Sequence, residues 1–159
     1  DSFVGVPVTF ANRWQNLLDR TVDLVILGDT YTIEREVKES STGAGFSFSS
    51  VIKYDGMVYY GNQTFVHCAE EQKRYDECSS IMTCVENSTT HYDFLNTAFP
   101  SRYFKIGSSL EEITEMLING TCNVLAHEKS FMQNVALLNV GIREGTFILG
   151  NKMKTKEPH

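Results

Sequence analysis

Short apolar runs alternate with amphipathic stretches along this chain, and that alternation predicts its secondary structure. Apolar runs predict strands at 3–10, 22–27, 80–85, 103–106, 122–126 and 145–149. Apolar residues at helical spacing, often after a capping residue, predict helices that begin near residues 12, 89, 108 and 130, and a short helix at 34–39. Strands and helices in alternation argue for an α/β fold with mainly parallel strands.

The same alternation suggests two parts. The segment 61–126 is expected to form its own small lobe of strand, helix, strand, helix and strand. Before it, residues 46–60 form an extended stretch in which Gly56 would let the chain cross from one lobe to the other. Open α/β sheets bind ligands at the carboxyl ends of their strands, so the loops there are the first places to search for a site.

Composition narrows the classes of function. The chain has 159 residues and a formal net charge of −6, so nucleic acid is not an expected partner. No apolar run reaches the length of a membrane span. His67, His91 and His127 are scattered and the cysteines do not form paired Cys-x-x-Cys motifs, so the sequence predicts no metal site and no cofactor.

Four cysteines and three N-glycosylation sequons indicate an extracellular compartment. The sequons begin at Asn62, Asn87 and Asn119. The cysteines stand at 68, 78, 84 and 122, and four cysteines allow three pairings. The alternative interpretation is a set of buried free thiols in a cytosolic protein.

The stretch from Val22 to Glu36 is the strongest functional signal. An apolar run stops at Gly28, two hydroxyls follow at Thr30 and Thr32, and Arg35 then begins a short helix. Hydroxyls, backbone N–H groups and a planar guanidinium after a strand make a good clamp for a carboxylate. The competing interpretation is that Arg35 is a solvated helix charge paired with a neighbouring glutamate, Glu34 or Glu36.

The order of motifs resembles the extracellular amino-acid solute-binding proteins, in particular the branch that binds general polar amino acids. The motifs are Asn-Arg-Trp-x-x-Leu from Asn12, Val-Asp-Leu from Val22, Thr-x-Thr-x-x-Arg from Thr30, and Phe-Ser from Phe46 followed by Tyr-Asp-Gly from Tyr54. The resemblance implies a periplasmic-binding-protein type 2 fold. Residues 61–126 would be a complete inserted lobe, and 1–60 with 127–159 an incomplete first lobe. Compared with that family, the chain looks truncated at both ends.

The resemblance also implies a ligand site between the lobes. Thr30, Thr32, Arg35, Thr89 and Thr90 would hold the carboxylate of an amino acid, and Glu128 would pair with its ammonium group. The family usually has an aspartate where Glu128 stands, and a glycine where Ser88 stands. The alternatives are that Thr89 and Thr90 only cap a helix, that Glu128 caps the next helix, and that His127 is a surface histidine. The family often has cysteines at positions 84 and 122, which implies the disulfides Cys84–Cys122 and Cys68–Cys78.

These features favour a secreted or extracellular module, periplasmic if bacterial, that binds a small amino acid without catalysis. The implied partners are an amino acid and a membrane transporter or receptor. The alternative is a ligand-free, glycosylated structural subunit of a surface assembly, since the Asn87 sequon lies in the proposed ligand loop. An uncovered edge of the strand at Val22 would favour self-association or a second chain that completes the first lobe. No nucleophile–base pair is visible, so an enzyme is not expected.

Overall fold

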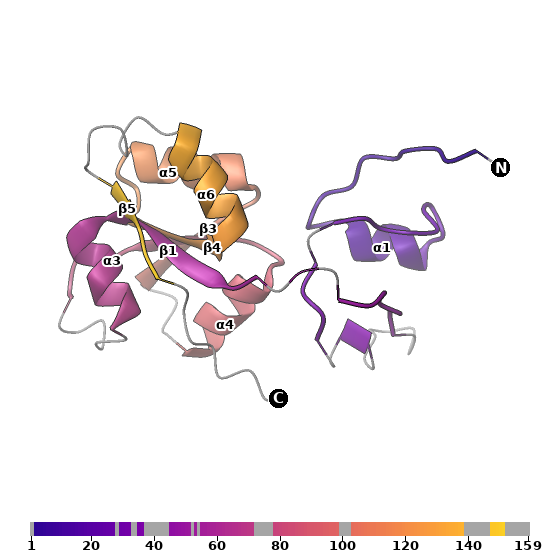
Figure 1. The fold of residues 1–159 in the computed structure, drawn as a ribbon, viewed down its shortest axis with the longest axis horizontal. Helices are drawn as coiled ribbons and strands as arrows, with labels where there is room; N and C mark the ends of the chain where they lie inside the picture. The colour runs from indigo at the N-terminus through magenta and orange to yellow at the C-terminus, as the bar shows by residue number, and fades with distance from the viewer. Residues whose placement is uncertain are drawn as a thin grey trace. The chain divides into compact units, whose positions relative to one another are not determined.

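The computed structural model describes residues 2–27, 29–32, 35–36, 45–51, 53, 55–71, 78–98, 103–138 and 147–151. The chain divides into two compact units (Figure 1). Unit 1 comprises Asp1–Val8 and Asn12–Tyr54, and unit 2 comprises Thr9–Ala11 and Asp55–His159. No helix among the described residues has the length and apolar character needed to cross a membrane.

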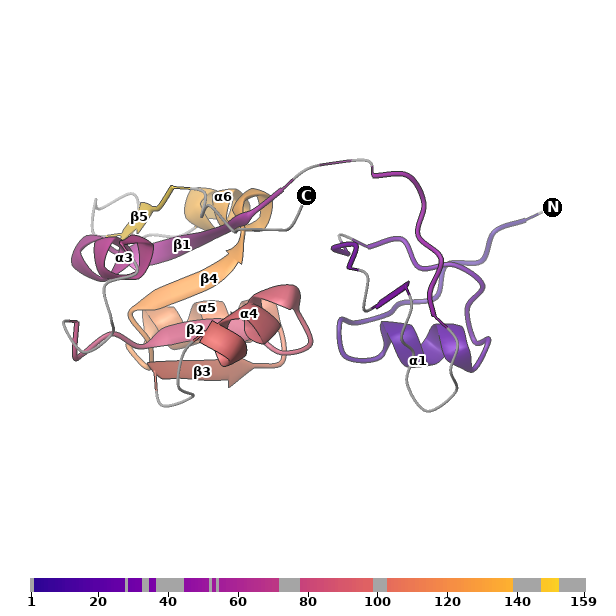
Figure 2. The ribbon, with the colours of Figure 1, turned by 90° about the horizontal axis from the view of Figure 1, so that it is seen from below.

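Unit 2 is built on a five-stranded sheet with the strand order β3-β2-β4-β1-β5 (Figures 1 and 2). Its strands are β1 (Met57–Asn62), β2 (Thr83–Glu86), β3 (Phe104–Gly107), β4 (Val124–Glu128) and β5 (Phe147–Leu149). Strand β2 pairs in parallel with β3 and β4, whereas β1 pairs antiparallel with β4 and β5. The prediction of an α/β fold is confirmed, but the sheet is mixed because β1 runs against both of its neighbours.

Helices cover both faces of this sheet. Helices α3 (Gln63–Glu70) and α4 (Thr90–Ala98) pack on one face, and α5 (Leu110–Ile118) and α6 (Lys129–Leu138) pack on the other (Figure 2). Successive residues of β1 therefore enter different cores, since side chains alternate across a strand. Tyr59 lies in the core with Val66 and Leu95, while Tyr60 lies in the core with Ile113 and Met132.

Two disulfides tie the sheet to its connections. Cys68, near the end of α3, bonds to Cys78 before β2, with 6.1 Å between the Cα atoms. Cys84 in β2 bonds to Cys122, two residues before β4, with 5.8 Å between the Cα atoms. These are the two pairs that the resemblance implied.

Unit 1 contains helix α1 (Arg13–Leu18) and otherwise mostly irregular backbone in its described residues. The predictions of strands at 3–10 and 22–27 are wrong for this structure. A strand needs hydrogen-bonding partners, and no described strand runs beside these segments; Leu24 and Ile26 are 68% and 87% exposed. Of the predicted helix at 34–39, only residues 35 and 36 are described, and they are helical.

The expected lobes were an incomplete first lobe of residues 1–60 and 127–159 and an inserted lobe of residues 61–126. This division stays a prediction about the longer fold of the family. In this chain, helix α6 and strand β5 belong to the same compact unit as residues 61–126. Strand β5 pairs with β1, and α6 packs on the same face of the sheet as α5. Unit 2 therefore holds every strand among the described residues.

Candidate functional site

Four ionisable side chains gather where β2 and β4 end. Glu86 is the last residue of β2, His91 lies in the first turn of α4, and His127 and Glu128 end β4. Because β2 and β4 are parallel neighbours, their carboxyl ends meet at the same edge of the sheet, and the β2–α4 loop lies at that edge. Glu86, His91 and His127 are each at most 5% exposed, so this acid–histidine cluster lies inside the unit.

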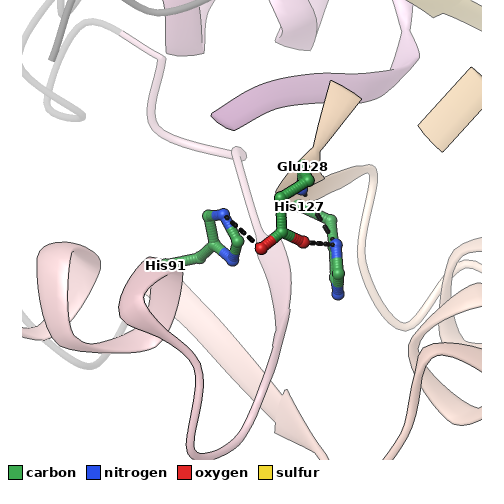
Figure 3. A group of neighbouring side chains, drawn as sticks. All are labelled: His91, His127 and Glu128. Atoms are coloured by element: carbon green, nitrogen blue, oxygen red, sulfur yellow. Dashed lines mark hydrogen bonds and ion pairs between the residues drawn. The ribbon is translucent and has the colours of Figure 1, made fainter. Parts of the chain in front are cut away.

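The Glu128 carboxylate lies between two imidazoles (Figure 3). Its Oε2 atom is 2.6 Å from Nδ1 of His127, and its Oε1 atom is 3.7 Å from Nε2 of His91. The other ring nitrogen of His127, Nε2, is 3.1 Å from Oε2 of Glu86. His127 thus lies between two carboxylates, and its ring centroid is 5.1 Å from that of His91.

The carboxylates control the charge of His127. Burial alone would lower its pKa, but the hydrogen bonds to Glu128 and Glu86 outweigh burial and raise the pKa to about 9. Burial likewise tends to raise the pKa of Glu128, yet the hydrogen bond to His127 and the nearby His91 hold it below its usual value. The interpretation of His127 as a surface histidine is wrong, since it is 1% exposed.

The threonines of the β2–α4 loop serve the backbone. The Thr89 hydroxyl donates to the carbonyl of Glu86 at 2.7 Å and accepts from the backbone N–H of Tyr92 at 3.2 Å. This is the helix-capping role considered above. Because the Thr89 hydroxyl already donates its proton to the Glu86 carbonyl, it cannot donate that proton to a ligand as well. Thr90 is the first residue of α4. Ser88 has φ of +59°, in the left-handed region that favours glycine, which is the residue the family has there.

In unit 1, Arg35 is held by its own turn. Its Nη1 atom donates to the carbonyl of Thr30 at 2.8 Å and lies 3.9 Å from Oδ1 of Asp29. The Thr32 hydroxyl oxygen accepts from the backbone N–H of Arg35 at 3.2 Å. The guanidinium carbon lies 5.4 Å from the ring centre of Trp14. Arg35 is therefore oriented by its turn rather than solvated beside Glu36; Glu34 lies outside the described residues.

Sequence reasoning missed the second arginine of this group. Arg13 is fully buried, donates from Nε to Oδ1 of Asp29 at 2.8 Å, and lies over the Trp14 ring at 4.6 Å. The Asn-Arg-Trp motif predicts a helix start and contributes to the family resemblance, but neither use assigns a role to Arg13; an arginine beside a tryptophan on a short helix is the signal that could have done so. Asp29 therefore joins Arg13 in an ion pair and lies near Arg35.

The structure thus brings Thr30, Thr32 and Arg35 together within unit 1, and Thr89, Thr90 and Glu128 at one edge of unit 2. The sequon asparagines play local structural roles: Asn62 caps α3 by accepting from the N–H of Thr64, and Asn119 accepts from the N–H of Thr121. Asn87 is exposed in the β2–α4 loop. Attachment of sugar at these positions stays a prediction.

Comparison with known proteins gives matches among solved structures only. No protein-family model matches the sequence, and no curated protein sequence matches it. A periplasmic binding protein of an ABC transporter from Brucella ovis, with glutathione bound, aligns with a TM-score of 0.67 and 21% identity, covering 96% of this chain and 46% of its own. An amino acid ABC transporter substrate-binding protein from Streptococcus pneumoniae, bound to L-arginine, aligns with a TM-score of 0.74 and 17% identity, covering 96% and 57%.

A third match is an ancestral amino-acid-binding protein, AncCDT-1, described as a precursor of cyclohexadienyl dehydratase. It aligns with a TM-score of 0.67 and 17% identity, covering 93% of this chain and 59% of its own. The chain therefore spans about half to three fifths of the length of these structures. Over the part that it spans, the chain has the fold of the type 2 periplasmic amino-acid-binding proteins, as its motifs indicated.

Proposed function

We propose that this protein is an extracellular solute-binding module that binds a small amino acid without catalysis. The carrying observation is that its fold matches those of amino-acid-binding proteins over 93–96% of the chain in the three structures described. Two charged side chains support the proposal, because Arg35 is a guanidinium oriented by its own turn and Glu128 is a largely buried carboxylate. A zwitterionic amino acid needs one group of each kind.

In the proposed complex, Arg35 takes the ligand carboxylate, with support from Thr30 and Thr32. A guanidinium carries five N–H donors in a planar fork, and the Thr30 carbonyl uses one side of that fork. The bond to Thr30 and the Trp14 ring limit the rotation of the side chain, so little entropy is lost when a carboxylate binds. The N-terminus of α4, at Thr89 and Thr90, would add backbone N–H groups and a favourable dipole.

Glu128 takes the ligand ammonium group in this proposal. Its side chain is 13% exposed, so it is mostly shielded from bulk water but still accessible to a ligand. A carboxylate has the charge that an ammonium group needs in its partner. The side chain is one methylene longer than the aspartate usual in the family, and His91 and His127 hold its carboxylate in place.

A thermal-shift screen of the twenty common amino acids tests the proposal. A ligand present at 100 times its Kd adds about 2.7 kcal/mol to the free energy of unfolding, so a true ligand should raise Tm measurably. Calorimetric titration of Arg35→Lys should then show at least about a tenfold loss of affinity, because an ammonium cannot make the bidentate contact. Lys105→Ala, at an exposed cation in β3, is the matched control and should bind normally.

A flat screen would contradict the proposal. It would leave the ligand-free, glycosylated structural subunit as the better interpretation, and light scattering of native material should then show an assembly. Binding that survives Arg35→Lys unchanged would keep the solute-binding role but reject Arg35 as the carboxylate partner. A membrane transporter or receptor as partner, and an exported location, belong to the same proposal and follow only if ligand binding is found.

A further inference from the structure

The acid–histidine cluster of unit 2 has a composition that amino-acid binding does not explain. An ammonium group needs one carboxylate, yet this edge of the sheet holds two carboxylates and two imidazoles, of which Glu86, His91 and His127 are buried. Burying ionisable groups is costly unless they are paired or bind a cation. Both histidines contact Glu128, and His127 also contacts Glu86, but an ammonium group requires neither imidazole.

We propose that His91, His127 and Glu128 form a site for a divalent transition-metal ion of the zinc type. One ligand atom from each of the three side chains lies within 4.8 Å of the other two (Figure 3). A tetrahedral zinc ion with bonds of about 2.0–2.1 Å requires ligand atoms roughly 3.3 Å apart, so small side-chain rotations bring the three into range. Two imidazoles and one carboxylate are a known zinc ligand set, and they leave a fourth position for water or another ligand.

Glu86 supplies the supporting contact that such sites need. A metal-binding histidine usually donates its second ring N–H to a carboxylate, which fixes the tautomer and makes the first nitrogen a better ligand. The Nε2 atom of His127 lies 3.1 Å from Glu86, which leaves Nδ1 directed toward Glu128. The backbone N–H of Glu128 also lies 2.9 Å from Nδ1, and a metal ion bound at Nδ1 would displace this contact.

The ligand types select among cations. Imidazole nitrogens suit zinc, cobalt, nickel and copper, whereas calcium and magnesium prefer oxygen ligands. The metal replaces the proton between His127 and Glu128, and that proton is released to solvent. The metal ion and the ligand ammonium group would both bind the Glu128 carboxylate, so they would compete for it. The metal proposal does not depend on the amino-acid proposal, because Arg35 takes part only in the latter.

Cobalt(II) and zinc(II) titrations of the full chain test this site. Purified protein stripped with a chelator should bind one zinc ion, and the cobalt form should show the intense visible absorption of a four-coordinate ion. Calcium and magnesium at equal concentration should give no binding. His91→Ala and Glu128→Gln should weaken zinc binding by more than about 100-fold, and Glu86→Gln by about 10- to 100-fold, because Glu86 acts only through His127.

His67→Ala is the matched control, since His67 forms a similar pair with Glu70 on α3, at 3.6 Å, and no second histidine among the described residues joins that pair. It should leave zinc binding unchanged, and Arg35→Lys should do so too, even where that variant no longer binds amino acids. Sub-stoichiometric zinc binding, a weak six-coordinate cobalt spectrum, or variants that bind zinc as the native chain does would each overturn the proposal. The cobalt spectrum of the native chain decides even where a variant fails to fold.

Discussion

Buried polar side chains in this protein are of two kinds. Those of the acid–histidine cluster contact one another, and Arg13 has Asp29 as its partner. The Tyr60 hydroxyl is different: its side chain is fully buried, and the oxygen has no hydrogen-bond partner among the described residues. A buried hydroxyl without a partner loses its hydration and gains nothing in return. The stabilising contact of Tyr60 is that of its ring, which packs edge-to-face on Phe147 at 5.8 Å between centroids.

We expect Tyr60→Phe to leave the free energy of unfolding unchanged or to raise it by about 1 kcal/mol, because it removes an unsatisfied polar group and keeps the ring. The effect should depend on pH. Burial raises the pKa of Tyr60 to about 12, against 10.0 for an unfolded tyrosine. Below pH 10 the phenol is protonated in both states, so its contribution to stability is fully present. Between pH 10 and 12 the unfolded state ionises first, and stability is lost.

Denaturant titrations of the native chain and of Tyr60→Phe at neutral pH and near pH 11 measure this. The native chain should lose more stability than the variant on going to the higher pH, since only the native chain has the buried phenol. Equal losses would mean that other groups dominate alkaline unfolding. A variant that is clearly less stable at neutral pH would show that the hydroxyl has a partner.

At the scale of elements, the two disulfides close loops of different length. Cys68 and Cys78 are separated by 10 residues, and Cys84 and Cys122 by 38. A crosslink stabilises mainly by restricting the unfolded chain, and the chain-entropy model gives about 3 kcal/mol for the shorter loop and about 4 kcal/mol for the longer one. The Cys84–Cys122 bond is also buried, so its loss leaves a cavity as well.

We therefore expect the double variant Cys84→Ala/Cys122→Ala to be less stable than Cys68→Ala/Cys78→Ala by at least about 1 kcal/mol. Guanidinium unfolding of both variants, each with the remaining disulfide oxidised, gives the comparison. Each variant is the control for the other, because each removes one bond and two sulfur atoms. A larger loss for the 68–78 pair would indicate that this bond mainly prevents fraying of α3.

The elements that could be predicted from sequence are those defined by their own residues. Helix α5 has a capping serine, two acidic residues in its first turn and an apolar stripe, and its structure begins after Ser109 as predicted. Its Glu112 accepts from the N–H and hydroxyl of Ser108, which lowers the pKa of that carboxyl. The run at 22–27 looks like a buried strand but is not one here, because a strand depends on partners that no local pattern specifies.

The candidate site was predicted in part for a similar reason. Arg35 and its threonines lie within six residues, so one sequence motif contains them all. His91 and His127 are far apart in sequence and looked scattered, yet they meet because β4 pairs beside β2. Strand β3 comes between β2 and β4 in the sequence but not in the sheet. The local pattern of apolar and polar residues does not predict this strand order. The resemblance implied that the loop at Thr89 and Thr90 meets Glu128, but the tertiary structure was needed to show that two histidines and two carboxylates share this edge.

At the scale of the whole molecule, the two units differ in what holds them together. All of the buried apolar side chains among the described residues belong to unit 2. In unit 1 the one buried side chain that the structure describes is Arg13, whose partners are Asp29 and the Trp14 ring. Burial of apolar area is the dominant stabilising contribution in folded proteins, and a buried ion pair is a weak substitute for it.

Amide hydrogen exchange should therefore separate the two units. We expect the amides of β1, β2 and β4 to exchange slowly, through global unfolding, because they are paired inside the sheet. The amides of residues 23–27 should exchange orders of magnitude faster, since no described strand pairs with them. Exchange followed at two protein concentrations supplies the control. Strong protection at both concentrations would contradict the expectation and show that 23–27 has a partner within the chain, whereas protection that grows with concentration would indicate pairing with a second copy.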